Sequence, residues 1–146
     1  MESKTSTKTI LSKMSGKALD VDRSSLKEGL QIIQWSHHGK ENQQWIFEKL
    51  GTDGGAYRIT SKASGLVLDV DGQSTTGGAA IIQWRWNEGP NQQWILEDAG
   101  SGYFYIISAE SGLVLDIDKG SMKDGAKLIQ WKKTGKDNQL WKLIDV

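Results

Sequence analysis

The apolar residues of this chain fall into short runs that are rich in β-branched and aromatic side chains. In the middle of the chain these runs span residues 59–61, 67–71, 80–84 and 93–96, and Gly, Ser, Asn or Asp bounds each of them. Runs of this length and composition are typical of β-strands. No stretch keeps the i, i+3, i+4, i+7 spacing of an amphipathic helix over three turns. The pattern therefore predicts an all-β chain.

The same pattern occurs three times along the chain. The motif Leu19-Asp20-Val21-Asp22 returns 49 positions later as Leu68-Asp69-Val70-Asp71, and a further 47 positions later as Leu115-Asp116-Ile117-Asp118. An Ile-Gln-Trp step and an Asn-Gln-x-Trp step repeat with the same two offsets. The sequence thus predicts a single domain, residues 1–146, made of three repeats at about 8–50, 57–99 and 104–146. Two glycine-rich linkers, at 51–55 and 98–102, join the repeats.

Four strands in each of three repeats make twelve short strands. Because one set of four strands cannot cover its own apolar face, the three related units must share one core. A closed arrangement with pseudo-threefold symmetry is the simplest one that leaves no open sheet edge. The pattern alone leaves an open sandwich or a propeller as alternatives, although three blades are too few for a propeller.

The composition argues against several classes of function. Lys and Arg together number 18 and balance the 18 Asp and Glu residues, whereas nucleic-acid binders normally carry a basic excess. The lack of cysteine rules out disulfides, thiol catalysis and cysteine-ligated metals. The two histidines, His37 and His38, are too few for a His-rich metal site. We therefore expect no metal, no cofactor and no nucleic-acid partner.

Two further features of the sequence bear on where the protein acts. No apolar run approaches the roughly 18 residues that a membrane-spanning helix needs, so we expect no membrane insertion. The first eight residues, Met1 to Lys8, lack the apolar core of a secretory signal. From these features we expect a cytoplasmic protein or one that is secreted without a leader.

Several of the repeated residues have a structural explanation. Trp45 and Trp94 precede pairs of apolar residues, and together with Trp141 they are expected to anchor the core. The glycines of three Ser-Gly steps, at 16, 65 and 112, are expected at turns with a positive φ angle. In each Leu-Asp-x-Asp motif the leucine alternates with the first aspartate, so the leucine should point inward and the aspartate outward. The second aspartate is expected to form a turn.

The tryptophan of each Ile-Gln-Trp step is poorly explained by core packing, because it ends a strand and is followed by a polar loop. With the outward aspartate and the Asn-Gln pair it forms a shallow group of one flat aromatic face, one carboxylate and two amides. An indole packs on the C–H face of a sugar ring, and carboxylates and amides hydrogen-bond to neighbouring hydroxyls. This pattern predicts carbohydrate-binding sites. The alternative is that the tryptophan caps the fold and the aspartate braces a loop.

These residues carry a resemblance to a known family. The three Gln-x-Trp steps, in register with Leu-Asp-x-Asp and Ile-Gln-Trp, resemble the ricin B-chain-like β-trefoil lectins. The absence of cysteine makes the chain more similar to the small fungal and bacterial members than to the plant ones. The resemblance implies a β-trefoil, with six strands in a short barrel, three hairpins that cap it and up to three sugar sites. Family members bind galactose, N-acetylgalactosamine or, as modules attached to glycosidases, xylan and related polysaccharides.

The resemblance also implies the residues of each site. The sugar-binding aspartate falls on Asp20, Asp69 and Asp116, and the stacking aromatic falls on Trp35, Trp84 and Trp131. A polar residue three positions further on falls on His38, Asn87 and Thr134. The amide pair falls on Asn42 and Gln43, Asn91 and Gln92, and Asn138 and Gln139. Because Thr134 is a shorter substitute, the third site is expected either to be tuned differently or to be weaker. Trp86 either extends the second site or is a fortuitous surface aromatic.

The predicted function is non-catalytic, multivalent binding of glycans of the galactose or N-acetylgalactosamine type, with a homo-oligomer left open. The alternatives are a module that binds a xylan-like polysaccharide and a protein-binding trefoil, such as a protease inhibitor or a toxin-complex component. Enzymatic activity is disfavoured: Asp20 and Asp22 offer the two carboxylates of a glycosidase, but the pair occurs three times without a deep cleft. The Asp-x-Asp motif also lacks the remaining ligands of a calcium loop.

Overall fold

The computed structural model describes residues 4–51 and 55–146, and this part of the chain contains twelve β-strands and six 3-10 turns. Met1 to Ser3 and most of the first predicted linker lie outside the described residues. The strands of the first repeat are β1 (Thr5–Ser12), β2 (Ala18–Asp20), β3 (Ile33–Trp35) and β4 (Trp45–Leu50). Those of the second are β5 (Ala56–Ser61), β6 (Val67–Val70), β7 (Ile81–Trp84) and β8 (Trp94–Gly100). Those of the third are β9 (Tyr103–Ser108), β10 (Val114–Ile117), β11 (Leu128–Trp131) and β12 (Trp141–Asp145).

Each repeat also contains two 3-10 turns, one after the first hairpin strand and one before its last strand. They are η1 (Asp22–Ser24), η2 (Glu41–Gln43), η3 (Asp71–Gln73), η4 (Pro90–Gln92), η5 (Asp118–Gly120) and η6 (Asp137–Gln139). None of the helical segments in the described ranges has the length and apolar character needed to cross a membrane.

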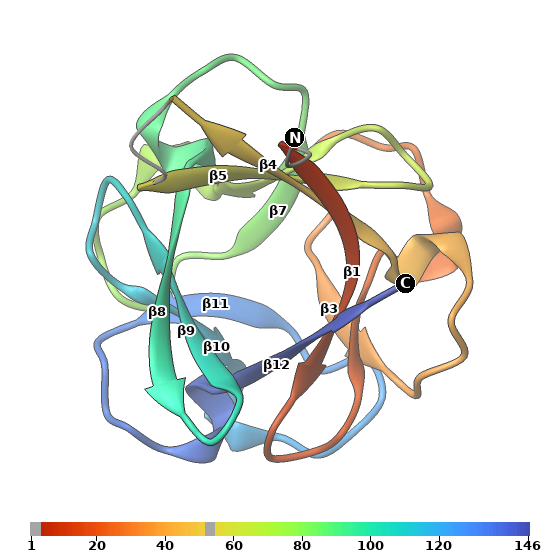
Figure 1. Ribbon diagram of the computed structural model, residues 1–146, viewed down its shortest axis with the longest axis vertical. Coiled ribbons are helices and arrows are strands. Elements are labelled where there is room, and N and C mark those ends of the chain that lie inside the picture. Colours follow the sequence, from red (N-terminus) through yellow and green to blue (C-terminus); the bar gives the residue numbers. More distant parts are fainter. Residues whose placement is uncertain (1–3, 52–54) are drawn as a thin grey trace.

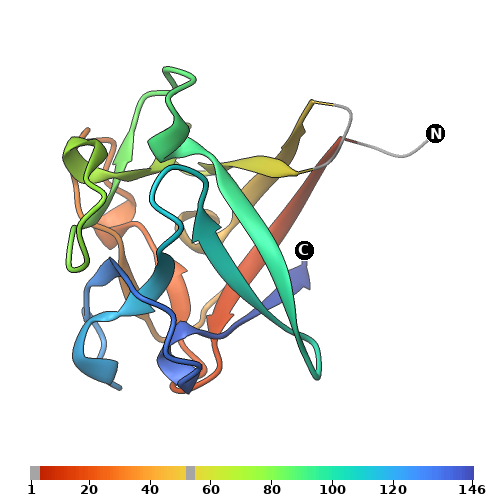
Figure 2. The same cartoon turned by 90° about the vertical axis from the view of Figure 1, so that its left-hand side faces the viewer.

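Six of the strands form a closed barrel. Antiparallel pairing runs from β1 through β4, β5, β8, β9 and β12, and β12 pairs with β1 again. The other six form the hairpins β2–β3, β6–β7 and β10–β11. Figure 1 shows the three repeats arranged around the centre of the molecule, and Figure 2 shows the hairpins gathered at one end of the barrel. The fold is therefore the β-trefoil that the resemblance implied.

The three tryptophans of the Gln-x-Trp steps anchor the core, as predicted. Trp45, Trp94 and Trp141 are each 0% exposed. The indole Nε1 of each donates a hydrogen bond to the carbonyl of the leucine in the Leu-Asp-x-Asp motif of the same repeat, at 3.1, 3.0 and 3.3 Å respectively. Each ring thus fills the core and fixes the hairpin strand above it, because a buried indole N–H needs an acceptor.

Glutamines of the Ile-Gln-Trp steps join the repeats to one another. The amide nitrogens of the buried Gln34, Gln83 and Gln130 each donate two hydrogen bonds of 2.9 or 3.0 Å to backbone carbonyls. The acceptors lie in another repeat: Ser121 and Lys123 for Gln34, Ser25 and Lys27 for Gln83, and Ser74 and Thr76 for Gln130. Repeat 1 is thereby bound to repeat 3, repeat 2 to repeat 1, and repeat 3 to repeat 2.

The predicted turns are present. Gly16, Gly65 and Gly112 have φ angles of 72°, 75° and 74°, in the left-handed region that glycine adopts most readily. The second aspartate of each Leu-Asp-x-Asp motif begins the turn η1, η3 or η5, and its carbonyl accepts the N–H of the serine three residues later. These turns carry the chain from the first strand of each hairpin toward the second.

Replacing Trp94 by Phe tests the anchoring role of the core tryptophans. The variant leaves a small cavity and an unpartnered Leu68 carbonyl, so we expect a loss of about 2 kcal/mol in the free energy of unfolding, measured by urea denaturation. Trp131→Phe is the matched control, because the Trp131 ring is 40% exposed. Equal losses in the two variants would contradict the anchoring role.

Candidate functional site

Each repeat carries a surface hollow that is lined by four of its five predicted site residues. Site 1 has a volume of about 640 Å³, site 2 about 220 Å³ and site 3 about 610 Å³. The predicted residues that line them are Asp20, Trp35, His38 and Asn42 in site 1; Asp69, Trp84, Asn87 and Asn91 in site 2; and Asp116, Trp131, Thr134 and Asn138 in site 3. In each repeat the structure therefore brings together an aspartate, a tryptophan, an asparagine and a fourth residue, which is polar.

The aspartate forms the floor of its hollow. Asp20, Asp69 and Asp116 are only 3%, 3% and 4% exposed, so the prediction of an outward surface carboxylate was wrong. Successive side chains of the hairpin strand do not alternate between a buried and a solvated face, because both faces of the strand are covered. In β6, for example, all four residues are buried. The carboxylate meets solvent only through the hollow.

Two amides from the turn before the last strand hold this carboxylate. In site 1 the Gln43 Nε2 donates to Oδ2 of Asp20 at 2.8 Å, and the Asn42 Nδ2 donates to Oδ1 at 3.3 Å. The same two bonds occur in site 2, at 2.8 and 3.2 Å, and in site 3, at 2.9 and 3.2 Å. We refer to this arrangement of one aspartate with its glutamine and asparagine as the amide clamp.

The glutamine of the clamp positions other groups and does not face the hollow. Gln43, Gln92 and Gln139 are each 0% exposed. In site 1 the Gln43 Nε2 also donates to the Ser36 carbonyl, and its Oε1 accepts the His38 N–H. Because its hydrogen-bonding groups are occupied, the glutamine fixes the loop and the carboxylate. Gln43, Gln92 and Gln139, which were predicted as sugar-binding residues, therefore lie behind the carboxylate and do not line the hollows.

In site 2 the asparagine of the clamp has one buried oxygen without a hydrogen-bond partner among the described residues. The Asn91 Nδ2 donates to Asp69 and to the Val70 carbonyl, at 3.2 and 3.1 Å. The unpartnered oxygen, Oδ1, is shielded from solvent and lies against Gly89, where an added Cβ would come within 2.7 Å of it. Asn91 therefore acts on site 2 by holding the Asp69 carboxylate through its amide nitrogen.

The tryptophan at the end of each hairpin is open to solvent, as predicted. Trp35 is 41% exposed and Trp131 is 40% exposed, while Trp84 is partly exposed. Each ring also lies against a glycine of another repeat; a methyl group at Gly78, for example, would lie 3.7 Å from the Trp131 ring. The equivalent neighbours are Gly125 for Trp35 and Gly29 for Trp84. The aromatic wall of each site is thus supported by a second repeat, a contact that the sequence did not reveal.

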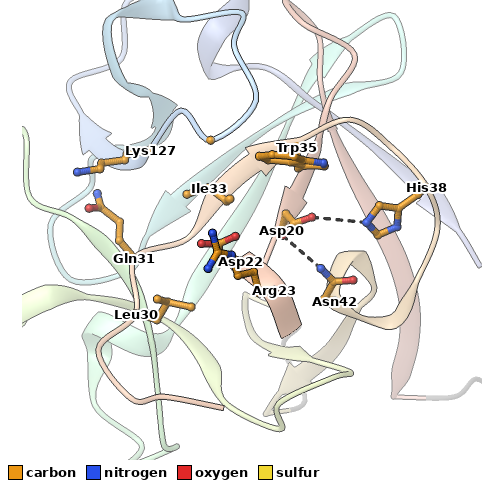
Figure 3. A pocket seen from close by; sticks show the side chains of 11 residues that line it. Asp20, Asp22, Arg23, Leu30, Gln31, Ile33, Trp35, His38, Asn42 and Lys127 are labelled. Carbon is orange, nitrogen blue, oxygen red and sulfur yellow. Dashed lines mark hydrogen bonds and ion pairs between the residues drawn. The ribbon is translucent and has the colours of Figure 1, made fainter. Parts of the chain in front are cut away.

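The fourth polar residue is held by the loop that follows the tryptophan. Figure 3 shows Asp20, Trp35, His38 and Asn42 of site 1 around a common space, with the His38 Nε2 3.9 Å from Oδ2 of Asp20. The side chains of His38, Asn87 and Thr134 each accept the backbone N–H two residues later. Trp86 is not among the residues that line site 2, and the Arg58 guanidinium lies over its ring at 4.9 Å.

Burial dominates the electrostatics of the clamped carboxylates. It raises the pKa of Asp69 to about 6, and the hydrogen bond from Gln92 counteracts part of this rise. Burial also raises the pKa of Asp20 and of Asp116, while the nearby His38 lowers that of Asp20 again. The Asp69 carboxyl is therefore ionised at neutral pH and becomes protonated in mildly acidic solution.

Comparison with known proteins identifies the family. A family model described as "Ricin-type beta-trefoil lectin domain-like" matches residues 2–84, 41–131 and 90–146, which together span nearly the whole chain. The chain belongs to this family, as the resemblance in the sequence indicated. No curated protein matches the chain.

Several solved structures are similar to this one. ThreeFoil, a designed protein with threefold symmetry, is 42% identical with a TM-score of 0.93, over 96% of this chain and 99% of that one. The exo-beta-1,3-galactanase 1,3Gal43A from Clostridium thermocellum is 39% identical with a TM-score of 0.92, but the match covers 97% of this chain and only 30% of the galactanase. The ricin B-like lectin of Macrolepiota procera, solved with lactose, is 22% identical with a TM-score of 0.81, over 99% of this chain and 98% of that one, and so supports the fold alone.

Gln92→Ala tests the clamp. The substitution leaves Asp69 Oδ2, the Arg85 carbonyl and the Asn87 N–H without their partner, so we expect a loss of about 2–3 kcal/mol in unfolding free energy. The neighbouring Gln93→Ala is the matched control, because the Gln93 side chain makes one exposed hydrogen bond, to the Glu88 carbonyl. Urea denaturation of both variants measures the difference. A clamp variant as stable as the control would refute the positioning role.

Proposed function

We propose that this protein is a non-catalytic, multivalent lectin that binds glycans of the galactose or N-acetylgalactosamine type through three sites. The observation that carries the proposal is the exposed indole beside a clamped carboxylate, repeated in all three hollows. A hollow open to solvent, with one wide aromatic wall, suits a ligand that is apolar on one face and rich in hydroxyls at its edge.

Each group in the site has a distinct part in this binding. The indole packs against the C–H face of the sugar ring and removes apolar surface from water. The carboxylate accepts hydrogen bonds from two hydroxyls of the sugar. The clamp holds the carboxylate in position before the ligand arrives, so little conformational entropy is lost when the sugar binds.

Names of the similar proteins support the choice of sugar. The Macrolepiota procera lectin was solved with lactose, and the earthworm R-type lectin C-half, 24% identical with a TM-score of 0.73, was solved with GalNAc. The more similar 1,3Gal43A is an exo-beta-1,3-galactanase, although this chain matches only 30% of it. The two bound sugars and the substrate for which the galactanase is named are all of the galactose type, which favours a galactose-type ligand over xylan. The galactanase also gives a second candidate, a module that binds a β-1,3-linked galactan chain.

Multivalency would supply the strength that a single open site lacks. A shallow sugar site contributes about −4 kcal/mol, which corresponds to a millimolar Kd. Three such sites engaging a clustered glycan raise the apparent affinity by about 10²–10⁴-fold. The protein would then agglutinate particles that display the glycan at high density.

Tryptophan substitutions test the proposal. We expect Trp35→Ala, Trp84→Ala and Trp131→Ala each to weaken binding at the altered site by roughly tenfold or more, because the sugar loses its apolar contact. The triple variant should not bind, whereas Trp86→Ala should bind normally. Isothermal titration with galactose, lactose, N-acetylgalactosamine, a β-1,3-galactan and xylo-oligosaccharides measures the effects. Binding by the triple variant at wild-type strength would rule out these sites.

Acid should weaken binding at site 2. The form that accepts hydrogen bonds from hydroxyls is the carboxylate, and the raised pKa of Asp69, about 6, means that protons compete with the sugar below this pH. At pH 5 about a tenth of the carboxyls are ionised, so we expect a roughly tenfold loss relative to pH 7. The measurement uses a protein with Trp35→Ala and Trp131→Ala, which leaves site 2 intact. An affinity that stays constant from pH 7 to pH 5 would contradict this role of Asp69.

A further inference from the structure

The middle residue of the turn that follows each clamped aspartate is different in each of the three sites. Arg23, Gly72 and Lys119 occupy equivalent positions in η1, η3 and η5, with φ angles of 54°, 66° and 58°. This left-handed conformation suits glycine and is unfavourable for other residues. Only site 2 has the glycine. Sites 1 and 3 instead carry a long cationic side chain at a position where the backbone disfavours it.

Both cationic side chains face the ligand space. Arg23 lines site 1 and Lys119 lines site 3. Figure 3 shows Arg23 beside Asp22, on the same side of the pocket as the clamped Asp20. No ion pair or side-chain hydrogen bond occupies Arg23 or Lys119 in residues 4–51 and 55–146. Their charges are therefore available to a ligand.

A second cation strengthens the difference between the sites. Lys127 lines site 1 and Lys136 lines site 3, and neither has an ion-pair partner in the described part of the chain. In Figure 3, Lys127 lies on the other side of Ile33 from Asp20, so its charge is set apart from the carboxylate. Sites 1 and 3 thus each combine two carboxylates with two cations.

Site 2 has the opposite character. Asp69 and Asp71 line it, and its lining includes neither lysine nor arginine. Glu110, from the third repeat, adds a negative charge close enough to act on Asp69. An anionic group in this hollow would meet uncompensated carboxylates, whereas in sites 1 and 3 it would meet cations beside them.

We propose that Arg23 and Lys119 are specificity-determining residues that bind an acidic group, a carboxylate or a sulfate ester, on a sugar adjacent to the one stacked on the tryptophan. Site 2, with Gly72, accepts neutral glycans only. This inference rests on the proposed function, because the acidic group must be carried into the hollow by a sugar on Trp35 or Trp131. An arginine offers paired N–H donors to such a group, and a lysine offers a point charge.

Proteins with a single intact site allow the test. Each is made by replacing the tryptophans of the other two sites by alanine, and each is titrated with lactose, with lactose sulfated on its galactose, and with sialyllactose as the carboxylate probe. At low salt we expect sites 1 and 3 to bind the acidic probes roughly fivefold or more tightly than lactose, and site 2 to bind them more weakly than lactose. The preference should shrink in 0.5 M NaCl, because exposed charges are screened.

Exchange of the turn residue is the matched control. Arg23→Gly and Lys119→Gly should abolish the preference for acidic probes while leaving lactose binding unchanged. Arg23→Gln should also abolish this preference at site 1, although it changes the bulk of the side chain less. Gly72→Arg should remove the discrimination of site 2 against the acidic probes, since the equivalent Arg23 adopts a similar φ. Thermal unfolding confirms that each variant is folded.

The outcomes separate the two proposals. If none of the single-site proteins binds lactose or either acidic probe, the proposed function is wrong, and this inference is then wrong as well. If lactose binds but the acidic probes bind equally well, or if their advantage survives Arg23→Gly and Lys119→Gly, only the inference is overturned. Acidic probes that bind the site 1 protein undiminished after Trp35→Ala would show general electrostatic attraction, which also overturns it.

Discussion

The buried carboxylate of each hairpin is the feature on which the rest of each site depends. An ionised group inside a protein is costly unless several donors satisfy it, and here two amides from a neighbouring turn do so. The same glutamine ties down the loop after the tryptophan. The same hydrogen bonds therefore stabilise the carboxylate and shape the hollow. A substitution that removes them disturbs both.

The repeated residues made most of this architecture predictable. Twelve strands, the three core tryptophans and the exposed indoles all follow from short periodic patterns in the sequence. The depth of Asp20, Asp69 and Asp116 did not, because alternation along a strand reports orientation and not what covers each face. The cross-repeat roles of Gln34 and Gly125 were also hidden, since the contacts that define them join residues about ninety positions apart.

The three hollows are alike in their clamps and unlike in their size. The sequence predicts that site 3 is tuned differently or is weaker, because Thr134 is shorter than His38 or Asn87. By volume, however, site 3 is close to site 1, at about 610 and 640 Å³, and site 2 is the small one at about 220 Å³. The size of each hollow depends on walls from more than one repeat, so it does not follow from the length of this one side chain.

The pairing of β1 with β12 has a consequence for the way such a chain is connected. Because the first and last strands are neighbours in the barrel, the peptide backbone makes a full circuit and the position of its break is topologically arbitrary. Opening the circuit between any two repeats would preserve every strand pair and every glutamine bridge. A circularly permuted chain, in which the repeats follow one another in the same cyclic order from a different starting repeat, should therefore form the same barrel.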